Sequence, residues 1–152
     1  MLTMNTPLTQ IDAYAKYAIG QRFQDKSGSE YIYLKGIGST ATGSWVTYSL
    51  DDGTTALLAA DAKGLVAVAM AATIASTWGW YQIAGLAQGL VVTATSADTT
   101  IGRETADGSV GDGRAAGDEI INAICLEANA SGGTLLTDVQ IMYPFVNDAT
   151  GA

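Results

Sequence analysis

The chain has 152 residues, no histidine and a single cysteine, Cys125. These counts exclude Ser-His-Asp and Cys-His catalytic sites, histidine-ligated zinc or haem, and an internal disulfide bond. Seven basic against fifteen acidic residues give a formal net charge of −8, which disfavours nucleic acid as a partner because phosphate is also negative. Hydrophobic residues make up 48% of the chain, so we expect one folded domain.

Neither a membrane span nor a signal peptide is expected. The longest apolar region, 56–73, contains Asp61 and Lys63, and the uninterrupted run 64–75 is shorter than the roughly twenty residues that a bilayer requires. The N-terminus has no basic segment followed by an apolar stretch. We therefore expect a soluble protein that does not bind a membrane.

Residues 1–19 differ in pattern from the rest of the chain. Apolar residues from Leu8 to Ile19 recur at spacings of three, four and seven, and Thr6 before Pro7 is a helix-start signal. A short amphipathic helix fits this pattern, and so does an extended arm. A segment that packs on its own domain fits equally well.

From Gly20 onward, frequent glycines separate short segments rich in β-branched and aromatic residues. A turn at 26–29 between the first two segments predicts a β-hairpin. Residues 64–71 are apolar throughout, which is typical of a strand buried on both faces, although a buried helix also fits. Residues 96–117 contain few apolar side chains and predict an exposed loop. The predicted strands are 21–25, 30–35, 44–50, 64–71, 77–83, 89–95, 119–128 and 137–143.

These elements predict an all-β fold. We expect a compact sandwich or a partly closed barrel of seven to nine short strands, with an N-terminal arm or short helix and one long exposed loop. The β domain would span 20–146, with 96–117 as its loop, and a polar tail would follow at 147–152.

The acidic residues do not form a recognisable catalytic or metal-binding motif. The loop from Asp107 to Asp118 departs from a calcium-binding loop because Asp112 stands where the sharp turn needs glycine. Asp51 and Asp52 precede a glycine, as in a turn. Cys125 lies in an apolar strand without a basic neighbour and is expected to be an inert core residue. We therefore expect no metal, no cofactor and no enzymatic activity, with a carboxylate-based hydrolase as a weaker alternative.

The aromatic run at 78–81 is the sharpest local feature. On a strand, Trp78 and Trp80 point to the same face. They would form either a stacking platform for a sugar or a partner chain, or a pair of core tryptophans, and the core arrangement is favoured.

Five segments occur in a characteristic order: GSEYIYLK (28–35), GSWV (43–46), GLVAVA (64–69), WGWYQIAG (78–85) and AGDE (116–119). Together they resemble the head decoration, or capsid cement, proteins of tailed bacteriophages. The resemblance covers roughly residues 19–143, and its most specific part is the Trp-Gly-Trp-Tyr-Gln run. The chain departs from the family in its leader at 2–17 and in its loop at 96–117.

This resemblance implies a structural virion protein that binds the outer surface of a phage capsid and reinforces it. Its partners would be the major capsid protein and further copies of itself, as a homotrimer. Its location would be the capsid exterior of the virion, after synthesis in the host cytoplasm. We expect Leu8, Ile11, Tyr14 and Tyr17 to form an arm that contacts the shell or a neighbouring copy.

A carbohydrate-binding or tail-adhesin module is the alternative function. Such a module would use Trp45, Trp78 and Trp80 as exposed stacking surfaces.

Overall fold

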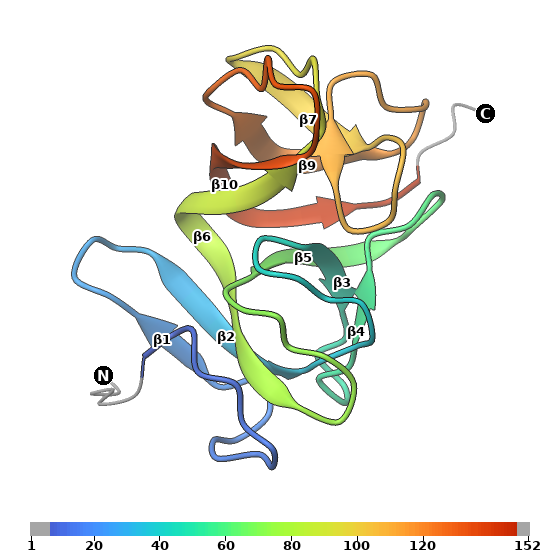
Figure 1. Ribbon diagram of the computed structural model, residues 1–152. Coiled ribbons are helices and arrows are strands. Elements are labelled where there is room, and N and C mark those ends of the chain that lie inside the picture. The colour runs from blue at the N-terminus through green and yellow to red at the C-terminus, as the bar shows by residue number, and fades with distance from the viewer. Residues whose placement is uncertain (1–6, 149–152) are drawn as a thin grey trace.

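The computed structural model describes residues 7–148 and is all-β in this range (Figure 1). This confirms the expected all-β class, although the described residues form ten strands where seven to nine short ones were expected. No helix within these residues is long and apolar enough to cross a membrane. The strands are β1 (Arg22–Gln24), β2 (Glu30–Lys35), β3 (Trp45–Tyr48), β4 (Thr55–Leu57), β5 (Gly64–Ala69), β6 (Trp78–Val91), β7 (Thr99–Arg103), β8 (Val110–Gly111), β9 (Glu119–Cys125) and β10 (Leu135–Val146).

All ten strands belong to one sheet, in the order β1-β2-β6-β8-β7-β9-β10-β5-β3-β4. Additional pairings of β6 with β10 and with β5 bring distant parts of this order together, so the sheet closes partly on itself. The predicted hairpin is confirmed, because β1 and β2 pair antiparallel with Arg22 opposite Ile32. Figure 1 shows β6 running through both halves of the molecule.

The strand β6 corrects the prediction of two separate strands at 77–83 and 89–95. Its first half pairs with β2 and its second half pairs with β10, so one continuous strand serves both halves of the sheet. The residues expected to separate the two strands instead continue the strand through a bend at Gly85, whose φ is +101°. A Cβ at Gly85 would lie 2.4 Å from Ser29 Oγ, so the bend needs glycine for its conformation and for its close packing.

The region 96–117 is also not an exposed loop throughout, as the sequence suggested. It contains β7 and β8, and its two branched aliphatic side chains, Ile101 and Val110, are fully buried. This polar segment can pack closely in the sheet because Gly102 has no side chain. A Cβ at Gly102 would lie only 2.1 Å from the Asp118 carbonyl oxygen. The composition gave the wrong answer here because two large apolar side chains suffice when both of them point inward.

The buried side chains form three clusters. The largest surrounds Trp45 between the two halves of the sheet, and the second contains Tyr81 and Ile83. The strand β5 contributes Val66 and Val68 to the first cluster and its alternate residues to the second, which confirms that it is buried on both faces. The third cluster consists of Tyr31, Tyr33 and Trp80 together with partly buried neighbours.

Candidate functional site

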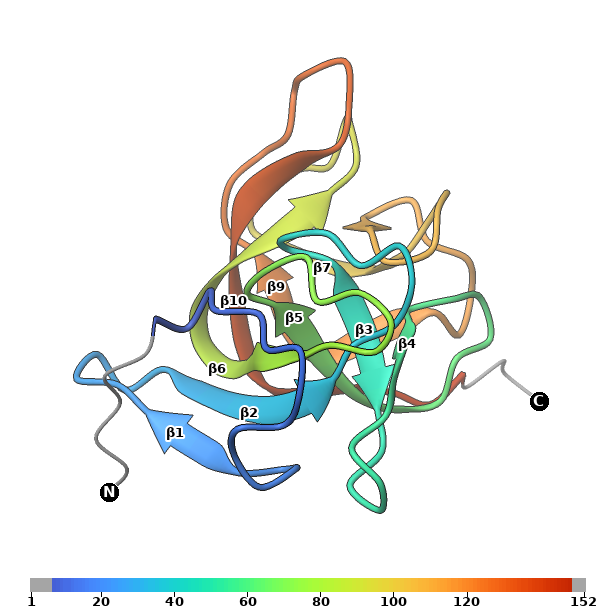
Figure 2. The same cartoon turned by 60° about the horizontal axis from the view of Figure 1, so that its bottom comes forward.

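Residues 8–17, which we call the strap, form no helix and lie against the sheet (Figure 2). The strap is anchored at Asp12, which exchanges two backbone hydrogen bonds of 2.9 Å with Trp78. The Asp12 side chain is buried, accepts a 2.6 Å hydrogen bond from the Tyr33 hydroxyl, and lies 3.0 Å from Lys16 Nζ. The helix alternative for this segment is therefore wrong for the described residues.

The strap divides the four predicted contact residues into two pairs. Tyr17 packs on Tyr33 and Trp80 with ring centroids 5.2 and 5.4 Å away, and Leu8 packs against the same cluster. In contrast, Ile11 is 37% exposed and Tyr14 is 68% exposed. Only this second pair is presented outward by the folded chain, and its contact with a partner remains a prediction.

The buried tyrosines are expected to resist ionisation at alkaline pH. Burial, together with the hydrogen bond to the Asp25 carboxylate, raises the pKa of Tyr31 to about 12. Burial also raises the pKa values of Tyr33, Tyr48 and Tyr81. Tyrosine in an unfolded chain titrates near pH 10, so the folded state holds these protons more tightly.

Because the folded state binds these protons more tightly, they contribute to the free energy of unfolding. This contribution is fully present below about pH 10 and is lost as the pH rises toward 12. Urea unfolding at a series of alkaline pH values should show this decline, and Tyr31→Phe should make it shallower. Phenolate absorbance of the native protein should lag behind that of the urea-unfolded chain. Coincident titration of the two states would contradict the prediction.

A second surface lies on the solvent side of β6, β9 and β10. Leu86 and Ile124 both pair with Gln140, one on each side, and directly paired residues of antiparallel strands share a face. Met142 follows two residues after Gln140 on the same strand, so it points the same way. We call this surface the β9–β10 face, and its apolar members are Leu86, Ile121, Ile124, Met142 and Phe145, which are 36–59% exposed.

The backbone beneath this face is irregular. The pairing of β9 with β10 shifts register between Ile141 and Phe145, so that three residues of β10 lie opposite one residue of β9. Asn122 and Tyr143 at this irregularity have φ values of +64° and +47°, a conformation that costs free energy for residues other than glycine. Strained bulges of this kind often occur where a strand is shaped for binding.

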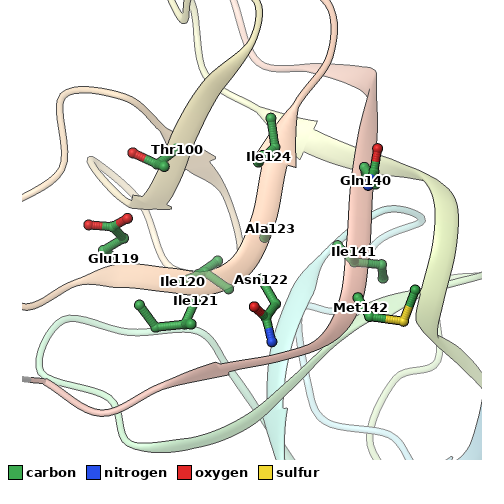
Figure 3. A pocket seen from close by; sticks show the side chains of 10 residues that line it. All are labelled: Thr100, Glu119, Ile120, Ile121, Asn122, Ala123, Ile124, Gln140, Ile141 and Met142. Atoms are coloured by element: carbon green, nitrogen blue, oxygen red, sulfur yellow. The ribbon is translucent and has the colours of Figure 1, made fainter.

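The β9–β10 face also contains a shallow hollow of about 350 Å³ (Figure 3). Ile121, Ile124 and Met142 line it, with Asn122 between the two strands. Glu119 is the only charged residue in its lining, and Arg114 Nη2 lies 3.2 Å from the Glu119 carboxylate. The hollow is therefore largely apolar, with its one charge already paired.

The three tryptophans do not form an exposed platform. Trp45 is fully buried and Trp80 is 1% exposed, while Trp78 is partly buried beside the strap. The favoured core arrangement is confirmed for Trp80. The stacking surface that the carbohydrate-binding alternative required is absent from the described residues.

The acidic loop does not fold as a calcium-binding loop. The Asp107 carboxylate lies 3.1 Å from Arg103 Nη2, whereas Asp118 is buried elsewhere and accepts a hydrogen bond from the Asp61 amide. Asp118, Asp61 and Asp148 bring their carboxylate oxygens within 4.8 Å of one another. Oxygen ligands at this spacing suit a divalent cation. The Asp61 amide donates a hydrogen bond to Asp118, and the Lys63 ammonium lies 3.9 Å from Asp148 Oδ2, whereas Asp148 Oδ1 is buried without a hydrogen-bond partner among the described residues.

The remaining candidate groups, Asp52, Asp112 and Cys125, have surroundings that suit a structural role. Hydrogen bonds from Thr54 lower the pKa of Asp52, and the Ser96 amide does the same for Asp112. A catalytic general acid needs a shift in the opposite direction. Burial raises the pKa of the Cys125 thiol, so this buried residue is a poor nucleophile, as expected from its apolar strand.

No known protein family, curated protein or solved structure matches this chain. The assignment of a function therefore depends on the strap and on the β9–β10 face.

Sequence reasoning singled out the strap but missed both the β9–β10 face and the carboxylate group. The face was hidden because the bulge at Asn122 breaks the period-two alternation that marks a strand with one exposed side. Asp61 and Asp118 are separated by 57 residues, so no local spacing could have indicated that they meet.

Proposed function

We propose that this chain is a structural virion protein that binds the outer surface of a bacteriophage capsid and reinforces it. The observation that carries the proposal is the anchored strap. Asp12 and Tyr17 fasten it to the sheet, and between these anchors the exposed Tyr14 is held outward, with Ile11 beside Asp12. The resemblance of the sheet segments to capsid cement proteins supplies the identity of the partner.

An anchored strap is suited to protein binding because part of the entropic cost of ordering has already been met on folding. Aromatic and aliphatic side chains held in place contribute more net affinity than the same side chains on a free tail. The exposed area of two residues is small, so a single contact of this kind is weak. Copies that are joined to one another as a homotrimer would compensate, because linked contacts bind a repeating surface with an avidity above the affinity of any one contact.

The charged groups also favour a binding role over catalysis. The carboxyl groups with a resolved pKa shift, Asp25, Asp52 and Asp112, are all shifted downward by hydrogen bonds, from nearby residues for the first two and from Ser96 for Asp112. Such carboxylates stay ionised at neutral pH and stabilise local structure. Their negative charge on the outside of a shell would also discourage stray binding to nucleic acid.

Co-sedimentation with phage heads assembled without this protein tests the proposal. The full chain should bind to saturation at a fixed ratio to the major shell protein. The double variant Ile11→Ser, Tyr14→Ser should lower the affinity about tenfold or more, since it removes two contacts of about 1 kcal/mol each. It leaves Asp12 and Tyr17 in place, unlike a deletion of the whole segment.

Leu50→Ser is the matched control, because Leu50 is 60% exposed in the turn after β3. It should bind like the unmodified protein. Failure of the unmodified chain to bind heads would overturn the proposed function. Normal binding by the double variant would overturn the role of the strap.

A further inference from the structure

We infer that the carboxylate group of Asp61, Asp118 and Asp148 binds a calcium ion. The inference goes beyond the proposed function, because it concerns the chain itself and does not depend on binding to a capsid. It also revises the expectation, drawn from the sequence, that the chain binds no metal.

Three separate segments of the fold bring the carboxylates together. Asp61 lies in the turn between β4 and β5, Asp118 directly precedes β9, and Asp148 follows the end of β10. The end of β10 pairs with the start of β5, where Val146 lies opposite Gly64, and this pairing carries Asp148 toward Asp61. The sheet therefore holds the carboxylates close together before any ion binds, which lowers the cost of forming a metal site.

The charge of the group is not balanced by the chain. Asp118 is only 3% exposed and forms no ion pair within the described residues, although its Oδ1 accepts a 3.1 Å hydrogen bond from the Asp61 amide. The basic side chain that does contact the group is Lys63, 3.9 Å from Asp148 Oδ2. Its side chain is 70% exposed, so solvent screens much of its charge.

A buried oxygen without a partner is the observation that points to a ligand. Asp148 Oδ1 is buried and has no hydrogen-bond partner in the part of the chain that the structure describes. Buried carboxylates in proteins are generally paired with an opposite charge or coordinate a metal ion. A cation between the three carboxylates would satisfy Asp148 Oδ1 and would balance the buried charge of Asp118.

The donor atoms and their spacing suit calcium. All three donors are carboxylate oxygens, which bind hard cations, whereas zinc prefers imidazole and thiolate ligands. Oxygens bound to one calcium ion at about 2.3–2.6 Å can be up to about 5 Å apart, so three oxygens within 4.8 Å of one another fit around one ion. Magnesium has shorter bonds and requires a stricter octahedral geometry. Asp61 is exposed, so water can reach the ion from that side and complete its coordination.

Isothermal titration calorimetry of the purified full chain with calcium chloride, after a chelator has removed divalent ions, tests the inference. The chain should bind one ion with a dissociation constant of about 0.1–1 mM, the range of the weaker calcium sites in proteins. Magnesium chloride should bind about tenfold more weakly or less. An ion that binds only the folded state stabilises it, so about 10 mM calcium should raise the midpoint of thermal unfolding by about 3 °C or more.

Two variants remove one carboxylate each and keep the size of the side chain. Asp118→Asn and Asp148→Asn should each lower the calcium affinity about tenfold or more and abolish most of the thermal shift. Asp107→Asn is the matched control, because the Asp107 carboxylate pairs with Arg103 outside the group. It should bind calcium like the unmodified chain.

A further variant is expected to bind calcium more tightly. Lys63→Met should raise the affinity about two- to fivefold, because the ammonium group competes with the ion for Asp148. A folding defect could not produce such a gain. Circular dichroism in the absence of calcium establishes that each variant is folded.

Three results would overturn the inference: no calcium binding by the unmodified chain up to about 10 mM, unchanged binding by both asparagine variants, or a lower affinity in Lys63→Met. Co-sedimentation with phage heads tests the proposed function separately. A chain that binds calcium but not heads would support the inference and overturn the capsid function. A chain that binds heads but not calcium would do the reverse.

Discussion

Replacing Trp45 by alanine is expected to lower the free energy of unfolding by about 3–5 kcal/mol. Trp45 is fully buried and lies in the largest cluster, where it packs among side chains from several strands. Its indole also packs closely on Gly89 of β6, where a Cβ would lie only 2.8 Å from the ring. Alanine would leave a cavity that rigid neighbouring strands can fill only partly. Urea unfolding followed by far-ultraviolet circular dichroism measures the loss.

Trp45→Phe separates the volume effect from the polar effect. The indole Nε1 is buried without a hydrogen-bond partner, so its removal also relieves the cost of a desolvated donor. We therefore expect Trp45→Phe to lose less than about 2 kcal/mol. The free energy of unfolding of a typical domain is only about 5–15 kcal/mol. If Trp45→Ala removes most of it and the variant does not fold, Trp45→Phe remains informative. A loss below about 1 kcal/mol for Trp45→Ala would contradict the structure of the core.

The sequence predicted local features of the fold well. The turn of the first hairpin and the apolar run of β5 are short-range patterns, and both elements formed as expected. The burial of Cys125 followed from its apolar neighbours in the same strand. In each case the information lies within about ten residues, which is the range over which hydrophobic periodicity operates.

Features that depend on distant contacts were not predictable in this way. Gly85 is a turn signal in sequence, yet its close packing on Ser29 makes it a bend within one long strand. Ile101 and Val110 are isolated apolar residues in a polar stretch, and only the sheet order brings them into the core. The strap shows the same limit, because its apolar spacing suggested a helix while Asp12 found its partners in β2 and β6.

That long-range anchor leads to the second large expected effect. Asp12→Ala should lower the free energy of unfolding by about 2–3 kcal/mol, since a hydrogen bond to a charged group contributes roughly 1.5–3 kcal/mol. The variant removes the acceptor of the 2.6 Å bond from the Tyr33 hydroxyl and the partner of Lys16. Faster hydrogen exchange at the Trp78 amide, which donates to the Asp12 carbonyl, should accompany the loss because the strap would open more often.

A double-mutant cycle isolates this interaction from other effects of the substitution. Asp12→Ala and Tyr33→Phe should show a coupling free energy of about 1–2 kcal/mol, because the two side chains share one hydrogen bond. Lys16→Met is the control: its side chain is 42% exposed, so its ion pair with Asp12 should contribute less than about 1 kcal/mol. Additive losses in the cycle, with Trp78 exchange unchanged, would mean that Asp12 does not fasten the strap. Ile11 and Tyr14 would then lose the support from which their binding role follows.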